Sequence, residues 1–221
     1  MAQSRAIRAI LEAIAVAVAP VVLLVSLLLH PYIGMGFPRA EAVAAAVVAH
    51  PNRWGFAHLA AAMASGLVLL ALLAVRRYLR EAGEERFSAF GIPFVAFGST
   101  LYAMLPAMEM SPLMAAKTGG NVEAVQTQLI RWFLPVLIVG AISFAIGVAG
   151  FARGIAASRV LSRQLTWLVV AALAVMAVAR FVPLSVVQFY VHGIAGIVAL
   201  WPLAYQMWTR PAQTMPASRP G

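Results

Sequence analysis

The sequence contains no cysteine and no aspartate, and only 10% of its 221 residues are charged. Without cysteine the chain has no disulfide, no thiolate metal ligand and no cysteine nucleophile. All seven acidic residues are glutamates, which excludes aspartate-rich phosphate-binding motifs and serine triads completed by aspartate. The sequence also lacks the G-x-S-x-G, H-E-x-x-H, Walker and G-x-G-x-x-G patterns. No standard catalytic motif is left, and the sequence does not decide whether the protein is an enzyme.

Apolar residues dominate the composition. They make up 63% of the chain, and the mean hydropathy is +0.90, far outside the range of soluble domains. Six apolar runs are each close to the length of about 20 residues that spans a bilayer: 9–29, 54–75, 89–108, 132–151, 164–183 and 188–207. The sequence therefore predicts an all-α integral membrane protein, a six-helix bundle that forms one domain over residues 1–209, followed by a disordered cytoplasmic tail, 210–221.

Basic residues are unequally divided between the two predicted faces of the membrane. Eleven of the 16 fall on the side of the termini and five on the other, and cytoplasmic flanks are enriched in lysine and arginine. Both termini are therefore expected to be cytoplasmic. The formal charge of +9 predicts anionic lipid headgroups as partners and not nucleic acid. The arginine-rich, alanine-rich composition is typical of a bacterium, which places the protein in the bacterial cytoplasmic (inner) membrane.

Two predicted outer loops contain signals for short helices. Residues 38–49 indicate one, with Pro38 in its first turn and valines on one side. Ser111 and Pro112 indicate a cap and a first-turn proline, and Gly119 ends that segment. Trp54 and Trp132, each preceded by arginine, are expected to anchor the outer membrane edge and suggest a faint internal repeat.

The four histidines all fall at the predicted outer face. His58 and His192 are each expected about one helical turn, roughly 6 Å, below that surface, and His30 ends the first span there. His50 is expected in a wetter loop. Glu109, which follows Met108, and Arg180 belong to the same layer.

Imidazole, carboxylate and thioether groups from several helices are donor types that bind copper, zinc or haem iron. The leading hypothesis is therefore an outward-facing polar pocket that holds a metal or a haem b for redox work. His58, His192, His30 and Glu109 are the candidate metal ligands. His58 and His192 are also the candidate axial ligands of a haem, and Arg180 would hold a haem propionate or another anionic ligand.

Six spans with four histidines resemble, in outline, the family of six-helix membrane cytochromes b that hold two haems between paired histidines on the two sides of the membrane. The resemblance implies histidine-ligated haem and electron transfer. The sequence departs from that pattern because no histidine falls at the inner face, so it leaves room for one outer haem at most.

A structural interpretation competes with the pocket. Histidine tolerates membrane interfaces, and the four side chains would then bond headgroups, water or loop carbonyls. Glu109 would form an interfacial ion pair with Arg131 or Arg180. In that case the protein is a non-catalytic membrane subunit or a small-molecule permease.

Overall fold

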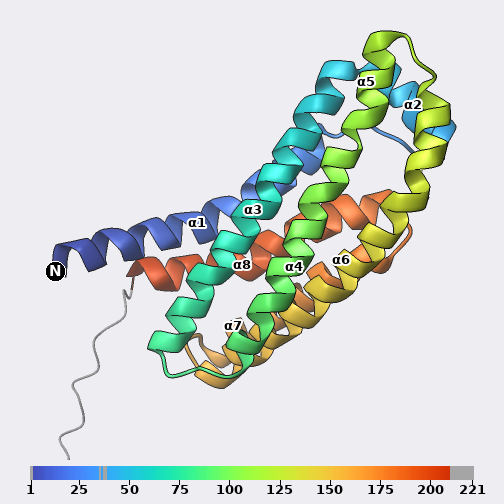
Figure 1. The fold of residues 1–221 in the computed structure, drawn as a ribbon. Helices are drawn as coiled ribbons and strands as arrows, with labels where there is room; N and C mark the ends of the chain where they lie inside the picture. Colours follow the sequence, from blue (N-terminus) through green and yellow to red (C-terminus); the bar gives the residue numbers. More distant parts are fainter. Residues whose placement is uncertain (1, 35, 37–38, 210–221) are drawn as a thin grey trace, which may run out of the picture.

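The computed structural model describes residues 2–34, 36 and 39–209, and within these ranges the chain is helical and contains no strand. The predicted tail, 210–221, lies outside the described residues. Figure 1 shows long helices that run side by side, with shorter ones gathered at one end. The helices are α1 (Ala2–Leu29), α2 (Ala40–Ala49), α3 (Pro51–Glu81), α4 (Phe87–Met108), α5 (Met110–Thr118), α6 (Val122–Ser158), α7 (Arg163–Val178) and α8 (His192–Thr209), with a 3₁₀ turn η1 (Ala179–Phe181) and a π-helical turn η2 (Val187–Val191).

Six helical segments are long and apolar enough to cross a membrane, as the sequence predicts. They are Ile7–Leu29, Pro51–Glu81, Phe87–Thr118, Val122–Ser158, Arg163–Phe181 and Val187–Thr209. Each packs against the next along the chain, and α8 packs against α1, so the six close into a ring. The connections are short except for the one between α1 and α3, which contains helix α2, and neighbouring helices of the ring are antiparallel.

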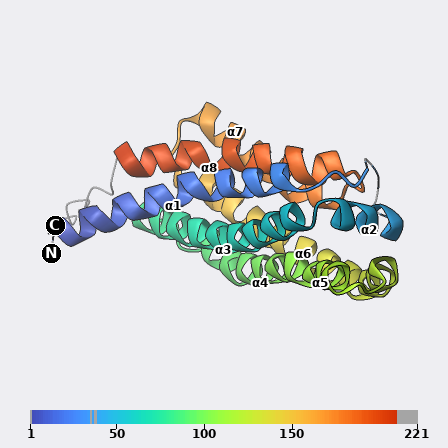
Figure 2. The same cartoon turned by 90° about the horizontal axis from the view of Figure 1, so that it is seen from above.

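The ring has two distinct ends, which we call the α2 end and the terminal end. The terminal end holds the start of α1 and the end of α8 (Figure 2), together with the α3–α4 and α6–α7 connections. The basic side chains divide between these ends as the sequence predicts: Arg39, Arg53, Lys117, Arg131 and Arg180 lie toward the α2 end. The side chain of Arg5, and the whole of Arg210 and Arg219, lie outside the described part.

Helix α2 covers one end of the ring. It begins at Ala40, and Pro38, the predicted first-turn residue, lies outside the described residues. Val43 and Val47 are buried in a small cluster with Trp54. Trp54 is therefore not the predicted surface anchor, because only 1% of it is exposed, whereas 74% of Trp132 is. The two Arg-Trp pairs therefore do not occupy equivalent environments.

Proline, glycine and asparagine residues account for the points where α4 ends, where α5 begins and ends, and where α6 begins. Pro112 has no N–H to donate to the helix, and α4 gives way to α5 nearby, at Glu109. The predicted cap at Ser111 is wrong, because α5 begins one residue earlier, at Met110. Gly119 ends α5 with φ of 74°, and the Asn121 side chain accepts a hydrogen bond from the backbone N–H of Ala124 at the start of α6.

Helices α4 and α6 approach each other through glycines. A Cβ atom added to Gly98 would lie 2.7 Å from the backbone nitrogen of Phe144, closer than van der Waals contact allows. Gly91, Gly147 and Gly150 are equally tight against the facing helix. Small residues permit such close approach between membrane helices, where packing is a main source of stability.

We expect Gly98→Ala to lower the free energy of unfolding by about 1–3 kcal/mol because α4 and α6 must separate to admit the methyl group. Gly66→Ala is the matched control. Gly66 also lies inside a long helix, but a Cβ there meets nothing within 4 Å, and alanine is the better helix former. Unfolding of the purified protein in detergent measures both, and equal stability of the two variants would contradict the close α4–α6 contact.

Candidate functional site

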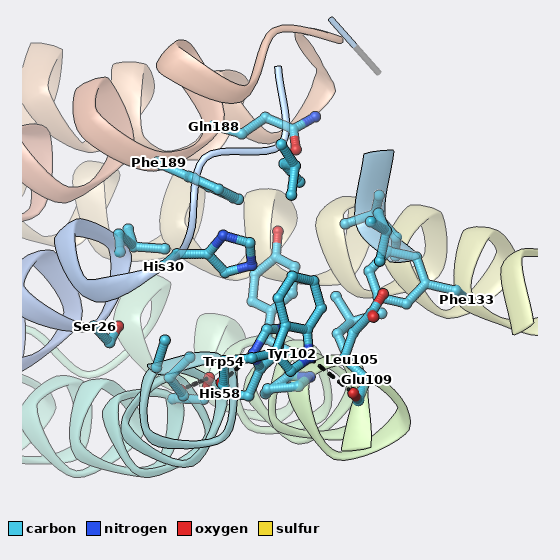
Figure 3. A pocket seen from close by; sticks show the side chains of 18 of the residues that line it. Ser26, His30, Trp54, His58, Tyr102, Leu105, Glu109, Phe133, Gln188 and Phe189 are labelled. Carbon is cyan, nitrogen blue, oxygen red and sulfur yellow. Dashed lines mark hydrogen bonds between the residues drawn. The ribbon is translucent and has the colours of Figure 1, made fainter. Parts of the chain in front are cut away.

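A cavity of about 140 Å³ lies inside the ring near the α2 end. Its walls come from α1, α3, α4 and α6, and α2, η1 and η2 contribute at its edges. Apolar side chains such as Leu105, Phe133 and Phe189 cover much of the wall, and Figure 3 shows them together with the polar groups. The polar lining residues are Ser26, His30, Trp54, His58, Ser65, Tyr102, Glu109, Gln126, Arg180 and Gln188.

Four side-chain atoms in this lining are buried and have no hydrogen-bond partner. They are the Tyr102 hydroxyl oxygen, Glu109 Oε2, Gln126 Oε1 and Arg180 Nε. Only six such atoms occur in the described part of the chain, so the majority gather around one cavity. An unpartnered buried polar atom costs about 1–3 kcal/mol, and a cluster of them is typical of a binding site that a ligand or water completes.

Glu109 and Gln126 form the acidic side of the cavity. Gln126 Nε2 donates to Glu109 Oε1 over 3.2 Å. Both residues are buried: Gln126 is 5% exposed and Glu109 is 7% exposed. Trp54 Nε1 donates to the backbone oxygen of Glu109 over 3.0 Å. This bond ties α3 to the break between α4 and α5, where the helical hydrogen-bond ladder is interrupted, and it fixes the height of the Glu109 side chain in the cavity.

Arg180 forms the basic side. It stands in the 3₁₀ turn after α7, and its Cζ lies 4.7 Å from the centre of the Tyr102 ring, a cation–π distance. Gln188 Nε2 donates to the carbonyl of Val182 over 2.9 Å, which holds the turn around Pro183 closed. The π-helical turn η2 that follows carries Gln188 and Phe189 into the cavity wall.

His30 and His58 are in ring contact, with centroids 4.9 Å apart. Nδ1 of His30 lies 2.7 Å from the carbonyl of Pro31, and Nδ1 of His58 lies 2.7 Å from the carbonyl of Trp54. A carbonyl can only accept, so both Nδ1 atoms carry the proton, and Nε2 of a neutral ring is left as an acceptor. Burial lowers the pKa of His30; the hydrogen bond to Pro31 opposes this effect and the nearby Arg53 adds to it, and together they bring the pKa to about 4.

The other predicted site residues lie elsewhere. His192 is 3% exposed and does not line the cavity. Its Nδ1 donates over 2.8 Å to the carbonyl of Met176, one of the last four carbonyls of α7, which have no partner within their own helix. The structure thus brings His30 to His58, and not His192 as the sequence suggests. His50 is exposed between α2 and α3, as expected.

The predicted ion pair of Glu109 is absent. Glu109 lies within 4 Å of no arginine nitrogen in the described part of the chain, and the ion pairs found there join Glu12 and Glu81 to Arg8 and Arg77. Within the same residues, no group of three or more histidine, cysteine or acidic side chains could hold a metal ion. Met104, Met108, Met110 and Met114 do not line the cavity.

Three cavity residues escape sequence analysis: Tyr102, Gln126 and Trp54. Tyr102 lies within an apolar span that also contains three phenylalanines, and Gln126 precedes the predicted start of its span. Trp54 looks like an interfacial anchor. The only hint of their role in the sequence is that each carries a polar atom that the bilayer cannot hydrogen-bond. The assembled helices are needed to show that these atoms meet in one cavity.

Comparison of the chain with models of known protein families, with curated proteins and with solved structures finds no match. The functional interpretation therefore depends on the geometry of the cavity.

His30 makes the stability of the protein depend on pH. Its pKa of about 4 lies below the ordinary value of 6.5, so between these values the unfolded chain binds a proton that the folded chain does not. We expect stability to fall as the pH decreases from 6.5 to about 4, by at most about 1.4 kcal/mol per pH unit from this group.

The variant His30→Asn keeps a donor for the Pro31 carbonyl but cannot titrate. Unfolding of the two proteins in detergent, measured between pH 7 and pH 4, should show a shallower loss of stability for the variant. Parallel curves would mean that His30 is solvated and titrates normally.

Proposed function

We propose that this chain is a multi-pass membrane protein that binds a small zwitterionic organic molecule in the cavity at the α2 end. The observation that carries the proposal is the separation of Glu109 from Arg180. Both side chains line one cavity and each has an unpartnered atom, yet they form no ion pair with each other. Ionisable groups in membrane spans usually pair, and a ligand with one charge of each sign would serve both.

The cavity fits a molecule of modest size. A hollow of about 150 Å³ accommodates benzene, and this one measures about 140 Å³. A small amino acid falls within that limit. Most ligand pockets combine apolar walls with a few well-placed polar groups, and here the rings of Trp54, Phe133 and Phe189 supply the apolar contact.

Each end of the ligand has matching groups. An anionic end would accept hydrogen bonds from Arg180 and the Tyr102 hydroxyl. A cationic end would donate to Glu109 Oε2 and Gln126 Oε1, with His30 Nε2 as a further acceptor. Charge-assisted hydrogen bonds of this kind are about twice as strong as neutral ones, so the four unpartnered atoms would all gain partners in one binding event.

Metal or haem binding by His58, His192, His30 and Glu109 is less well supported. His192 bonds Met176 and is not a lining residue. A porphyrin has four pyrrole rings and exceeds a cavity the size of benzene, and the contact of His30 with His58 leaves no space for a macrocycle between them. Of the functional classes that the sequence leaves open, the geometry thus favours a small-molecule permease over a redox protein.

The binding proposal predicts that small zwitterions stabilise the protein. Glycine, alanine, proline and γ-aminobutyrate are suitable probes, and thermal unfolding in detergent measures the effect. A probe at 100 times its Kd would stabilise the folded state by about 2.7 kcal/mol. We expect Arg180→Gln and Glu109→Gln each to weaken binding of the best probe about 10- to 100-fold.

Gln206→Leu is the matched control, because Gln206 also has a buried unpartnered oxygen but does not line the cavity. It should leave the affinity unchanged. The proposal fails if none of the probes stabilises the protein, or if acetate and ethylamine, which carry one charge each, act as strongly as the zwitterions.

We also propose that the protein lies in the cytoplasmic membrane of a bacterium with both termini cytoplasmic. The support is the arginine-rich terminal end, since cytoplasmic flanks attract basic residues. The ligand cavity would then face the outside.

The absence of cysteine allows a direct test of this orientation. Lys117→Cys lies at the α2 end and Glu85→Cys at the terminal end, and both native side chains are exposed. A membrane-impermeant maleimide should label Lys117→Cys in intact cells and label Glu85→Cys only after permeabilisation. The reverse pattern would place the cavity on the cytoplasmic side.

A further inference from the structure

A second hollow lies at the terminal end, between α1 and α3. It measures about 470 Å³ and opens to the outside of the ring. We call it the α1–α3 groove. It is lined by Arg8, Leu11, Glu12, Ala15, Leu70, Leu73, Ala74, Arg76, Arg77 and Arg80, so it contains none of the residues of the ligand cavity.

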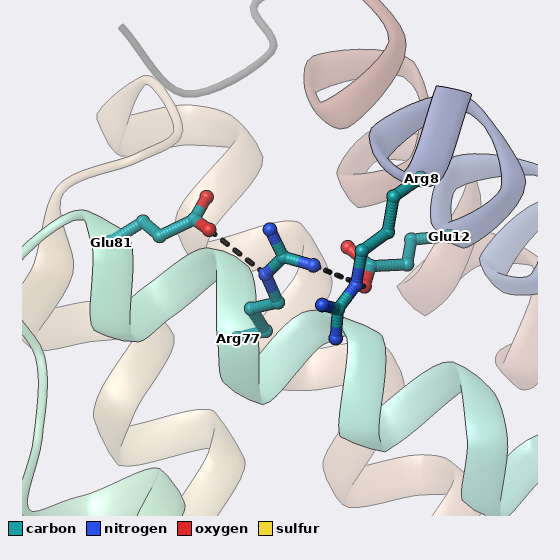
Figure 4. A network of polar contacts seen from close by, with 4 residues as sticks. All are labelled: Arg8, Glu12, Arg77 and Glu81. Atoms are coloured by element: carbon teal, nitrogen blue, oxygen red, sulfur yellow. Dashed lines mark hydrogen bonds and ion pairs between the residues drawn. The ribbon is translucent and has the colours of Figure 1, made fainter. Parts of the chain in front are cut away.

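Two of the four arginines of the groove, Arg8 and Arg77, share one glutamate, Glu12. Glu12 Oε1 accepts from Arg8 Nε over 3.1 Å and from Arg77 Nη1 over 2.8 Å, while Arg77 Nε donates to Glu81 over 2.9 Å. Figure 4 shows this chain of contacts between the two helices. Arg8 and Glu12 lie four residues apart on α1, whereas Arg77 reaches Glu12 from α3. Arg77, although basic, is thus fixed by two carboxylates and does not extend freely toward water.

The lining of the groove changes from charged to apolar with depth. Four arginines against one glutamate give the lining a net charge of +3. Leu11, Leu70 and Leu73 are 59%, 55% and 42% exposed. From Leu70 to Arg80 the helix rises by about 15 Å, which takes the groove from the apolar part of the span to the basic end of α3.

We propose that the α1–α3 groove binds one anionic glycerophospholipid, with the phosphate among the arginines and an acyl chain along the leucines. Charge complementarity selects an anionic headgroup, and basic pockets between membrane helices are suited to such lipids. The exposed leucines select a lipid over a soluble anion, because a free phosphate would leave them unused.

The proposal predicts selective lipid binding by the purified full-length protein. Phosphatidylglycerol and phosphatidylcholine with identical acyl chains are the probes, and titration followed by native mass spectrometry measures their affinities. We expect phosphatidylglycerol to bind more tightly. Arg8→Gln combined with Arg80→Gln should weaken it about 30-fold, since each basic residue near a lipid surface contributes about 1 kcal/mol. Ala15→Phe, which fills the groove without changing charge, should weaken both lipids.

Arg159→Gln combined with Arg163→Gln is the matched control. Both arginines are exposed at the terminal end but lie outside the groove, and the loss of charge is the same. This variant should change the affinity for phosphatidylglycerol by less than about threefold. An equal loss in both double variants would show a diffuse attraction to the basic end and overturn the proposal. Equal binding of the two lipids, or no effect of Ala15→Phe, would overturn it as well.

Discussion

Polar groups inside a bilayer must find their partners within the protein, because the hydrocarbon offers none. Continuous helices meet this demand for the backbone, but the described chain breaks its helices at Glu109 and again after Val178. Side chains from other helices supply the missing partners. Trp54 donates to the carbonyl of Glu109, and His192 donates to the carbonyl of Met176. The ring of six helices therefore depends on two aromatic N–H groups at its α2 end.

The same breaks create the cavity. A helix that continued through Glu109 would need no donor from Trp54, and a straight α7 would give no 3₁₀ turn to carry Arg180. Where the ladder is interrupted, these side chains turn toward the interior of the ring, and more polar atoms collect there than the protein itself can satisfy. Breaks in membrane helices are a common way to build binding sites, since irregular backbone is tolerated where it lines a cavity.

The sequence predicts the spans well because the length and apolarity of a membrane helix are local properties. It also predicts the layer that contains His30, His58, Glu109 and Arg180. It fails on the pairing of His58, because depth in the membrane does not determine the direction in which a side chain points around the ring. It fails for Trp54 for a related reason, since α2 folds over a position that would otherwise meet the interface.

In the described part of the chain, opposite charges are paired at the terminal end and unpaired at the α2 end. This contrast distinguishes the ligands that we propose for the two sites. In the α1–α3 groove Glu12 is shared by Arg8 and Arg77, and four arginines line the groove against this one glutamate, so the surplus charge is positive and favours an anion. In the cavity the charges are balanced but apart. Pairing Glu109 with Arg180 would relieve both, because an uncompensated buried charge is costly. Their separation on the wall of one hollow is the observation from which the zwitterionic ligand is proposed, and an anionic lipid at the opposite end would not supply its positive charge.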